Sequence, residues 1–403
     1  MAVMADTAAR GFTAIEFFLH HFRGNSPAPF DGEGNAPFSK RLDGSPWDGS
    51  LVYVDAVNEA PDFTHPNAPY WATIDDIIAS AASRNLMVLW FPAYAGLSDG
   101  LDGWLVEMAA NGVAKMQSYG AWVANRYKDA PNIVWMLGGD RGLAGEAEIA
   151  VEQALIEGLL SVRGQRSILF SNEWQGESIG TDQPVFGRHI NLNGCYSWGG
   201  RTASICRKGY AHTPAIPAFL QEGPFDEEGP DGNSANPSAV QPIRRFSWWG
   251  WLSAIAGYTF GNGYAWSMMP GYTEHLDTEQ TRHHTILNNF VRSIEWWTLV
   301  PDGLGDIGTL VTAGAGAMDT DSYVAAAANP GGTLLVAYLG PGHAGEVTID
   351  MGKMRGSASG RWFDPTSGDY QAVGTLPNSA TSTFAPPGVN AAGDRDWVLI
   401  LTS

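Results

Sequence analysis

The segment NIVWMLGGD (residues 132–140) is the most informative stretch for the fold. It is apolar along its length rather than alternating, as in a strand covered on both faces of a parallel sheet. Six further runs of this kind lie at 13–19, 86–93, 167–172, 189–197, 215–222 and 256–266. Helical patterns lie between several of them, at 70–84, 105–127, 146–162 and 243–255. Strands that alternate with helices predict an α/β fold, here a (β/α)8 barrel of the TIM type.

The N-terminus departs from a complete barrel. The chain opens with ADTAARGF (5–12), which is typical of the end of a helix that leads into the strand at 13–19. We count that strand as the second, and seven predicted strands are one short of the eight in a TIM barrel. The sequence therefore predicts a barrel without a normal first strand, and a truncation and a substitute strand both remain open.

The pattern changes beyond Pro301 to short β-rich runs separated by glycine turns. These runs lie at 322–329, 333–340, 345–352, 360–370 and 396–402. They predict an antiparallel β-sandwich without a cluster of acids, bases or nucleophiles. We expect two domains, a barrel over residues 1–300 and a supporting β-sandwich over residues 301–403.

Composition excludes several classes of function. The 42 acidic residues against 23 basic ones give a formal net charge of -19, which disfavours nucleic acid and anionic membranes as partners. No apolar run of about 18 residues is present to span a membrane, and residues 1–12 do not have the pattern of a secretion signal. The 16 tryptophans and 13 tyrosines favour a sugar ligand slightly, because sugar rings stack on flat aromatic rings.

Two carboxylates end predicted strands. Asp140 follows the run at 132–139, and Glu222 ends the run at 215–222. Counted from the second strand they end strands four and seven, at the barrel face where reactive side chains stand. Cleavage of a glycosidic bond needs one acid to protonate the leaving oxygen and one carboxylate to stabilise or trap the anomeric carbon. The pair therefore predicts glycoside hydrolysis with Asp140 and Glu222 as the catalytic residues.

Structural roles are the alternative for both acids. Asp140 would then cap the following helix, and Glu222 would pair with a surface arginine. Gly138 and Gly139 favour the catalytic interpretation, because they would let a substrate approach the backbone next to Asp140.

Several motifs, in this order, resemble those of the apiosidase-like glycoside hydrolases. They are NIVWMLGGD (132–140), FLQEGPFDEE (219–228) and RRFSWWGWLSAIAGYTFGNGYAW (244–266). The segments LLVAYLGPGHAGEVTIDMG (334–352) and RWFDPTSGDY (361–370) resemble the small C-terminal β-domain, labelled collagen-binding, that usually accompanies this family.

The resemblance implies roles for the two acids. The aspartate of the GGD motif, here Asp140, would be the acid/base, and the glutamate of the E-x-x-aromatic-acid motif, here Glu222, would be the nucleophile. Phe225 and Asp226 match the rest of that motif, although the family more often has Tyr-Glu there, a difference that concerns a hydrogen bond in one subsite.

Weaker predictions concern substrate binding. The expected substrate-binding residues are His20, His21, Glu173, Tyr196, Asn262 and Trp266. One of the two histidines is expected to face the cleft, because adjacent strand residues point to opposite sides. Tyr196 would bond the nucleophile and Trp266 would lie under a sugar ring, whereas Asn262 either binds substrate or holds a loop together.

Two other patterns do not predict sites. His275, His283 and His284 lack the i, i+4 spacing of helical metal ligands, so we expect no metal. The segment GGDRGLAG (138–145) lacks both the Lys-Ser/Thr of a phosphate loop and the three-glycine spacing of a dinucleotide site. We therefore expect no cofactor.

The predicted function is a glycoside hydrolase that cleaves a plant cell-wall glycan or glycoside by a retaining mechanism. Pectin is polyanionic, and Arg141 or Arg244 could offset its repulsion by an acidic protein. The alternatives are a neutral furanoside or β-glycan as substrate, or a catalytically silent carbohydrate-binding protein. The substrate class suggests an extracellular or periplasmic location. The sequence leaves open the oligomeric state and whether Cys195 and Cys206 form a disulfide.

Overall fold

The computed structural model describes residues 2–19, 29–50, 57–96, 103–143, 145–163, 168–183, 186–198, 200–228, 239–266 and 268–403. The chain divides into two compact units. The first consists of Met1–Gly176 and Gly180–Leu192, and the second of Glu177–Ile179 and Asn193–Ser403.

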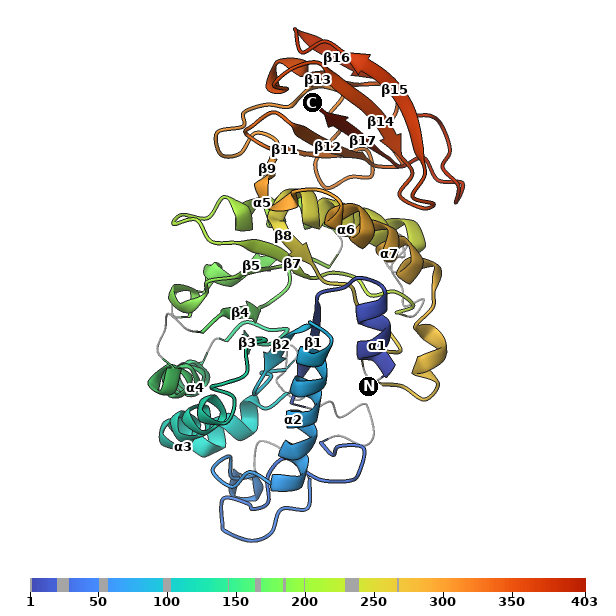
Figure 1. Ribbon diagram of the computed structural model, residues 1–403. Coiled ribbons are helices and arrows are strands. Elements are labelled where there is room, and N and C mark those ends of the chain that lie inside the picture. Colours follow the sequence, from blue (N-terminus) through green and yellow to red (C-terminus); the bar gives the residue numbers. More distant parts are fainter. Residues whose placement is uncertain are drawn as a thin grey trace. The chain divides into compact units, whose positions relative to one another are not determined.

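The first unit contains four parallel strands in the order β1-β2-β3-β4. Its main elements are α1 (Ala2–Ala9), β1 (Ala14–Phe18), α2 (Ala68–Ser83), β2 (Met87–Phe91), α3 (Leu105–Arg126), β3 (Ile133–Gly138), α4 (Glu146–Arg163) and β4 (Phe170–Glu173). Every residue of β3 is buried, which explains why its sequence shows no alternation. Helices α3 and α4 pack against each other (Figure 1).

The second unit begins with another four-stranded sheet, in the order β5-β6-β7-β8. Its elements are β5 (Ser178–Ile179), β6 (Asn193–Tyr196), α5 (Thr202–Tyr210), β7 (Ala218–Glu222), α6 (Val240–Ala254), β8 (Ile255–Tyr258) and α7 (Glu279–Arg292). Strands β6, β7 and β8 are parallel, whereas β5 pairs antiparallel with β6.

All seven predicted runs contain strands, and the α/β fold with parallel strands is confirmed. One feature differs from the expected single barrel sheet, because the described strands form two four-stranded sheets. Strand β5 pairs with the edge of β6 at which a closed barrel sheet would continue. A helix, α1, precedes β1, as the N-terminal sequence predicts.

The C-terminal part of the second unit is an antiparallel β-sandwich, as predicted (Figure 1). One sheet has the order β15-β14-β17-β12-β11-β9 and the other the order β10-β13-β16. The strands are β9 (Val300–Pro301), β10 (Val311–Ala313), β11 (Val324–Ala328), β12 (Leu334–Leu339), β13 (Val347–Asp350), β14 (Ala358–Phe363), β15 (Tyr370–Leu376), β16 (Thr381–Phe384) and β17 (Trp397–Thr402). A shared core contains Leu335 and Leu401 from the larger sheet and Val347 and Ile349 from the smaller one.

Helix α6 packs its tryptophans into the core of this unit. Trp248 and Trp251 are each 1% exposed and belong to the same hydrophobic core cluster. The Trp248 ring stacks on Tyr338 of β12, with ring centroids 5.7 Å apart. A single core therefore joins α6 to the β-sandwich, and the predicted domain boundary after residue 300 remains a prediction.

Arg244 is a buried structural residue rather than a surface charge. Its guanidinium donates two hydrogen bonds to the Asp396 carboxylate and one to Asp394, all at 2.8 Å. Burial disfavours its charged form, but Asp396 and Asp394 together hold the pKa of Arg244 above its usual value. The idea that Arg244 offsets repulsion of an anionic glycan is therefore wrong, because its charge is neutralised inside the protein.

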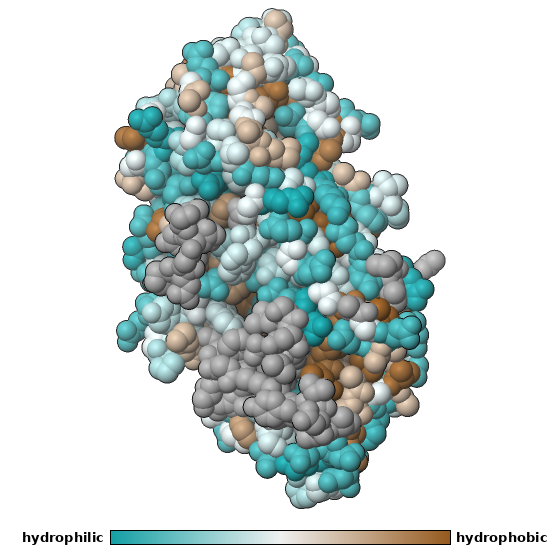
Figure 2. Space-filling model, turned by 180° about the vertical axis from the view of Figure 1, so that it is seen from behind, coloured by the Kyte–Doolittle hydropathy of each residue, from teal (hydrophilic) through white to brown (hydrophobic). Residues whose placement is uncertain are grey.

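The coloured residues on the face seen in Figure 2 are more often hydrophilic than hydrophobic, with smaller groups of hydrophobic side chains among them. None of the described helices has the length and apolar composition needed to cross a membrane. Cys195 and Cys206 are both buried free thiols, which answers the question of a disulfide between them.

Candidate active site

Asp140 lies two residues beyond Gly138, the last residue of β3, and is half-buried. Its backbone N–H donates a hydrogen bond of 3.2 Å to the Tyr94 hydroxyl. That hydroxyl in turn donates to Oε1 of Glu173, also at 3.2 Å. Glu173 is the last residue of β4 and is 4% exposed, so its carboxylate is part of the support for the Asp140 backbone.

The two glycines before Asp140 are required by packing. Gly138 has a φ of +79°, and a Cβ there would lie 2.5 Å from the Glu173 carbonyl oxygen. A Cβ on Gly139 would lie 2.7 Å from the backbone nitrogen of Gly96. These contacts lie within the chain. Packing alone therefore explains both glycines of the GGD motif, without the close approach of a substrate that the sequence suggested.

A buried glutamate from α4 also supports this turn. Oε1 of Glu152 accepts the Gly138 N–H at 2.9 Å, and the side chain is fully buried. Burial raises the pKa of Glu152 to about 7 despite that hydrogen bond. Gly138, the first glycine of the GGD motif, is thus held by a carboxyl group whose neutral form is favoured by burial.

Glu222 ends β7 and is half-buried. In the β6–β7 ladder it pairs with Tyr196, the last residue of β6, which is 5% exposed. The N–H of Ser197 donates to the Glu222 carbonyl oxygen at 3.0 Å. The backbone of Glu222 is therefore held at the carboxyl end of the strand, directly after a register shift in the β6–β7 ladder.

Three aromatic rings follow the three neighbouring parallel strands of this sheet. Trp198, Phe225 and Trp266 come after β6, β7 and β8, and we call them the aromatic platform. The Phe225 ring centroid lies 5.7 Å from that of Trp198 and 6.5 Å from that of Trp266. Trp198 is 37% exposed and Trp266 is 39% exposed, so both tryptophans leave apolar surface in solvent. The sequence predicted Trp266 but missed Trp198.

Asn262 organises the loop that carries Trp266. Its Oδ1 accepts the N–H groups of Tyr264 and Ala265, both at 3.0 Å. Its side-chain Nδ2 donates to the Glu227 carboxylate at 3.2 Å, and its backbone carbonyl oxygen accepts the Trp266 backbone N–H at 3.1 Å. These contacts agree with the second of its two predicted roles, and they explain a buried asparagine without a substrate.

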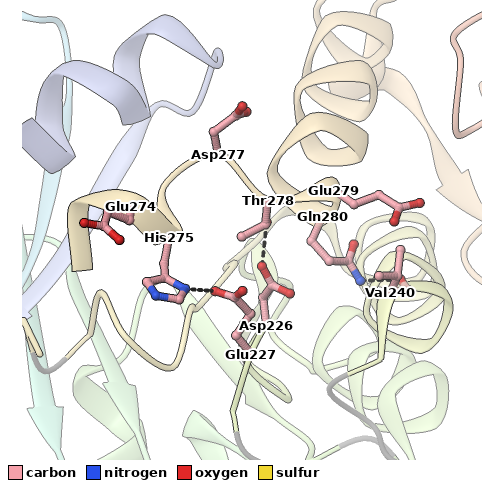
Figure 3. Close-up of a pocket in the computed structure, with 9 residues that line it drawn as sticks. All are labelled: Asp226, Glu227, Val240, Glu274, His275, Asp277, Thr278, Glu279 and Gln280. Atoms are coloured by element: carbon pink, nitrogen blue, oxygen red, sulfur yellow. Dashed lines mark hydrogen bonds and ion pairs between the residues drawn. The ribbon is translucent and has the colours of Figure 1, made fainter. Parts of the chain in front are cut away.

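A pocket of about 460 Å³ opens beside this loop (Figure 3). Thr278 donates a hydrogen bond of 2.6 Å to Asp226, and Nδ1 of His275 lies 2.8 Å from Glu227. Burial raises the pKa of Asp226, which is 4% exposed. The lining residues are Asp226, Glu227, Val240, Glu274, His275, Asp277, Thr278, Glu279 and Gln280.

The other histidines named from the sequence either have structural partners or lie outside the described residues. His284 lies 2.7 Å from the Ser247 hydroxyl and 2.8 Å from the Gln280 carbonyl, and burial lowers its pKa to about 3. Nδ1 of His283 lies 3.1 Å from Arg244. Within the described part of the chain, no group of three or more histidine, cysteine or carboxylate side chains is arranged to hold a metal ion. His20 and His21 lie outside the described residues.

The sequence matches two family models. The model described as "Apiosidase-like, catalytic domain" matches residues 3–298. The chain belongs to the apiosidase-like family. A second model, "Putative collagen-binding domain of a collagenase", matches residues 310–402 of this apiosidase-like chain. The predicted family is therefore confirmed, and with it the assignment of the chain as a glycosidase.

Solved structures of similar fold are also glycoside hydrolases. One described as a glycoside hydrolase has a TM-score of 0.74 at 17% identity and covers 100% of this chain and 88% of its own. A family 5 glycoside hydrolase from Bacteroides vulgatus has a TM-score of 0.74 at 18% identity, and the match covers 99% of this chain and 84% of the hydrolase. A family 27 β-L-arabinopyranosidase variant from Geobacillus stearothermophilus has a TM-score of 0.54 at 9% identity, and the match covers 100% of this chain and 93% of the arabinopyranosidase. No curated protein matches the sequence significantly.

Tyr94 provides a test of the support for Asp140 in this apiosidase-like chain. Tyr94→Phe removes the hydroxyl that joins the Asp140 N–H to Glu173, so we expect kcat to fall about 10- to 100-fold with a smaller change in KM. Tyr119→Phe is the matched control, because Tyr119 is also buried but its hydroxyl bonds the Pro92 carbonyl. Equal losses of kcat in the two variants would contradict the positioning role.

Glu152 provides a test of the buried carboxyl. Its pKa is raised from 4.5 to about 7 in the folded state, so its contribution to stability is complete below pH 4.5 and is lost as the pH rises to about 7. Glu152→Gln keeps an acceptor for Gly138 but cannot ionise. We therefore compare the change that Glu152→Gln causes in the free energy of unfolding at pH 8 with the change that it causes at pH 4. The change at pH 8 should be more stabilising, by up to about 3 kcal/mol.

Urea unfolding of both proteins at the two pH values measures this difference. Glu157→Gln, on the exposed face of α4, is the control and should show no such pH dependence. An identical effect of Glu152→Gln at pH 4 and pH 8 would rule out the buried ionisation.

Proposed function

We propose that this apiosidase-like glycosidase cleaves a plant cell-wall glycan or glycoside with retention of anomeric configuration. The observation that carries the proposal is the position of two acids, each half-buried at the carboxyl end of a parallel strand within the apiosidase-like catalytic region. Asp140 follows β3 and Glu222 ends β7. That is the edge at which α/β barrels place their reactive side chains.

In the proposed first step, a Glu222 oxygen attacks the anomeric carbon and forms a covalent glycosyl ester. Asp140 gives its proton to the glycosidic oxygen as the bond to the leaving group breaks, so that no alkoxide has to depart. In the second step, Asp140 takes a proton from water, and the water oxygen attacks the anomeric carbon. The ester bond then breaks and Glu222 leaves as a carboxylate. Two inversions at one carbon give net retention.

The surroundings of each acid suit these roles. The backbone of Asp140 is tied to Tyr94, and Tyr94 to Glu173, so the acid is carried on a fixed turn. Glu222 is held by the β6–β7 ladder and by Ser197. Fixed backbones matter because a displacement of about 1 Å of a reacting group can cost 100-fold in rate.

The experiment is a screen of the purified chain for release of reducing sugar from plant polysaccharides, including pectin with apiose side chains, arabinan and β-glucan. NMR of the anomer formed first then tests the mechanism. Retention is expected, with a carboxyl separation of about 5–5.5 Å in a crystal structure, whereas inversion and about 6.5–9.5 Å would overturn the retaining mechanism.

The second candidate is a catalytically silent carbohydrate-binding protein. The aromatic platform favours it, because exposed tryptophans would bind a glycan whether or not the bond is cleaved. Glycan binding without any release of reducing sugar across the screen would decide for this candidate.

A further inference from the structure

The aromatic platform lies at a defined edge of one sheet. Trp198, Phe225 and Trp266 follow β6, β7 and β8, which are neighbouring parallel strands, and Glu222 is the last residue of β7. All three rings therefore lie at the carboxyl edge to which Glu222 also belongs. Phe225 is in contact with both tryptophans, so the rings form one continuous apolar surface.

Close packing and backbone hydrogen bonds hold the segments that carry Phe225 and Trp266. A Cβ on Gly261 would lie 2.3 Å from the Phe225 ring, so only glycine leaves room for that ring. Asp226 and Asn262 form a parallel bridge beyond the ends of β7 and β8, and Asp226 N–H donates to the Gly261 carbonyl at 2.9 Å. Asn262 then closes the turn that carries Trp266. The Phe225 ring is thus placed by close packing, and the turn that carries Trp266 is held by hydrogen bonds.

The surface next to the platform is acidic. Phe225 is followed in the chain by Asp226 and Glu227, which line the pocket in Figure 3. The described lining contains neither lysine nor arginine, one histidine and five acidic residues, four of them exposed and the fifth, Asp226, buried. Charges within about 8 Å act on a ligand even at physiological salt, so a uronate chain would be repelled here. Carboxylates do accept hydrogen bonds from the hydroxyl groups of a neutral sugar.

We infer that the aromatic platform binds a neutral glycan chain of at least two sugars and excludes polyuronates. The C–H face of a sugar ring is apolar, and each exposed indole can cover one such face. Two exposed tryptophans on either side of Phe225 account for the two sugars. The ligand class rests on the proposed function, which it narrows from plant cell-wall glycans in general to their neutral chains.

The test is affinity electrophoresis of the full-length Glu222→Gln protein, which should not consume the glycan, in gels containing one probe each. The neutral probes are xyloglucan, arabinan and mixed-linkage β-glucan, and polygalacturonate is the anionic probe. We expect at least one neutral probe to retard the protein, and Trp198→Ala and Trp266→Ala each to raise its Kd roughly tenfold. Polygalacturonate should not retard it.

Trp297→Ala is the matched control, because Trp297 is 64% exposed and does not belong to the platform. Three results would overturn the inference: no retardation by any neutral probe, an equal loss on Trp297→Ala, or equally strong retardation by polygalacturonate. Wild-type hydrolysis of the same probes separates the two proposals. Platform-dependent binding without hydrolysis of these probes or of any other polysaccharide in the screen rejects the proposed function alone. Hydrolysis with binding unchanged by Trp198→Ala and Trp266→Ala rejects the platform alone.

Discussion

Glu222→Ala is expected to lower kcat by at least about 10⁴-fold, because in the proposed mechanism the Glu222 carboxylate is the group that forms the glycosyl ester. Truncation also leaves a space beside the anomeric carbon that a small anion can enter. Sodium azide should therefore restore part of the activity on an activated aryl glycoside. Azide would attack in a single displacement, so the glycosyl azide should have the anomeric configuration opposite to that of the substrate.

The control for this variant is Glu346→Ala, which removes an exposed carboxylate from the β-sandwich and should leave kcat unchanged. Circular dichroism would confirm that Glu222→Ala remains folded. Turnover near the wild-type rate, or an azide product that keeps the substrate configuration, would remove Glu222 from the nucleophile role.

The sequence predicted those parts of the fold in which local pattern and tertiary environment agree. Strand β3 is buried throughout and is apolar throughout, so its run at 132–139 could be recognised in isolation. Helix α5 and strand β5 were missed. The helix has nine residues, and β5 has only two and exists through its pairing with β6. Elements of that kind depend on contacts that a local pattern does not contain.

The candidate site also contains residues that the local sequence pattern predicts and residues that only the tertiary contacts reveal. Asp140 and Glu222 could be proposed from the sequence because each lies at the end of a recognisable strand, where barrel enzymes place their reactive side chains. Tyr94 and Glu152 could not be found. Tyr94 meets Glu173 across 79 positions of sequence, and Glu152 reaches Gly138 from the interior of a helix. The only available signal for Glu152 was a charged residue at an apolar helix position.

Arg244 shows why charge counts mislead for individual residues. In the sequence it is one of 23 basic residues and was expected to be available to a ligand. In the structure it is 2% exposed and forms ion pairs with Asp394 and Asp396. Arg141 is also paired, with Glu148 at 3.2 Å. Both arginines named for an anionic substrate are therefore paired with carboxylates of the chain itself.

Asp140→Ala should slow the two chemical steps differently, and that difference identifies the acid/base. On a natural glycan the leaving alcohol needs a proton, so kcat/KM should fall about 10²- to 10⁴-fold. On an aryl glycoside with a good leaving group the first step needs little acid catalysis, so kcat/KM should fall much less. The second step still lacks its base, so the glycosyl-enzyme should accumulate and give a burst of released phenol.

Azide gives the decisive comparison with Glu222→Ala. In Asp140→Ala the glycosyl ester still forms, and azide attacks it without needing a base. The product has then been inverted twice and should keep the substrate configuration, the reverse of the result for Glu222→Ala. Asp129→Ala, at an exposed position of the same unit, is the control. Equal losses of kcat/KM on the glycan and on the aryl glycoside, without a burst, would show that Asp140 is not the group that protonates the leaving oxygen.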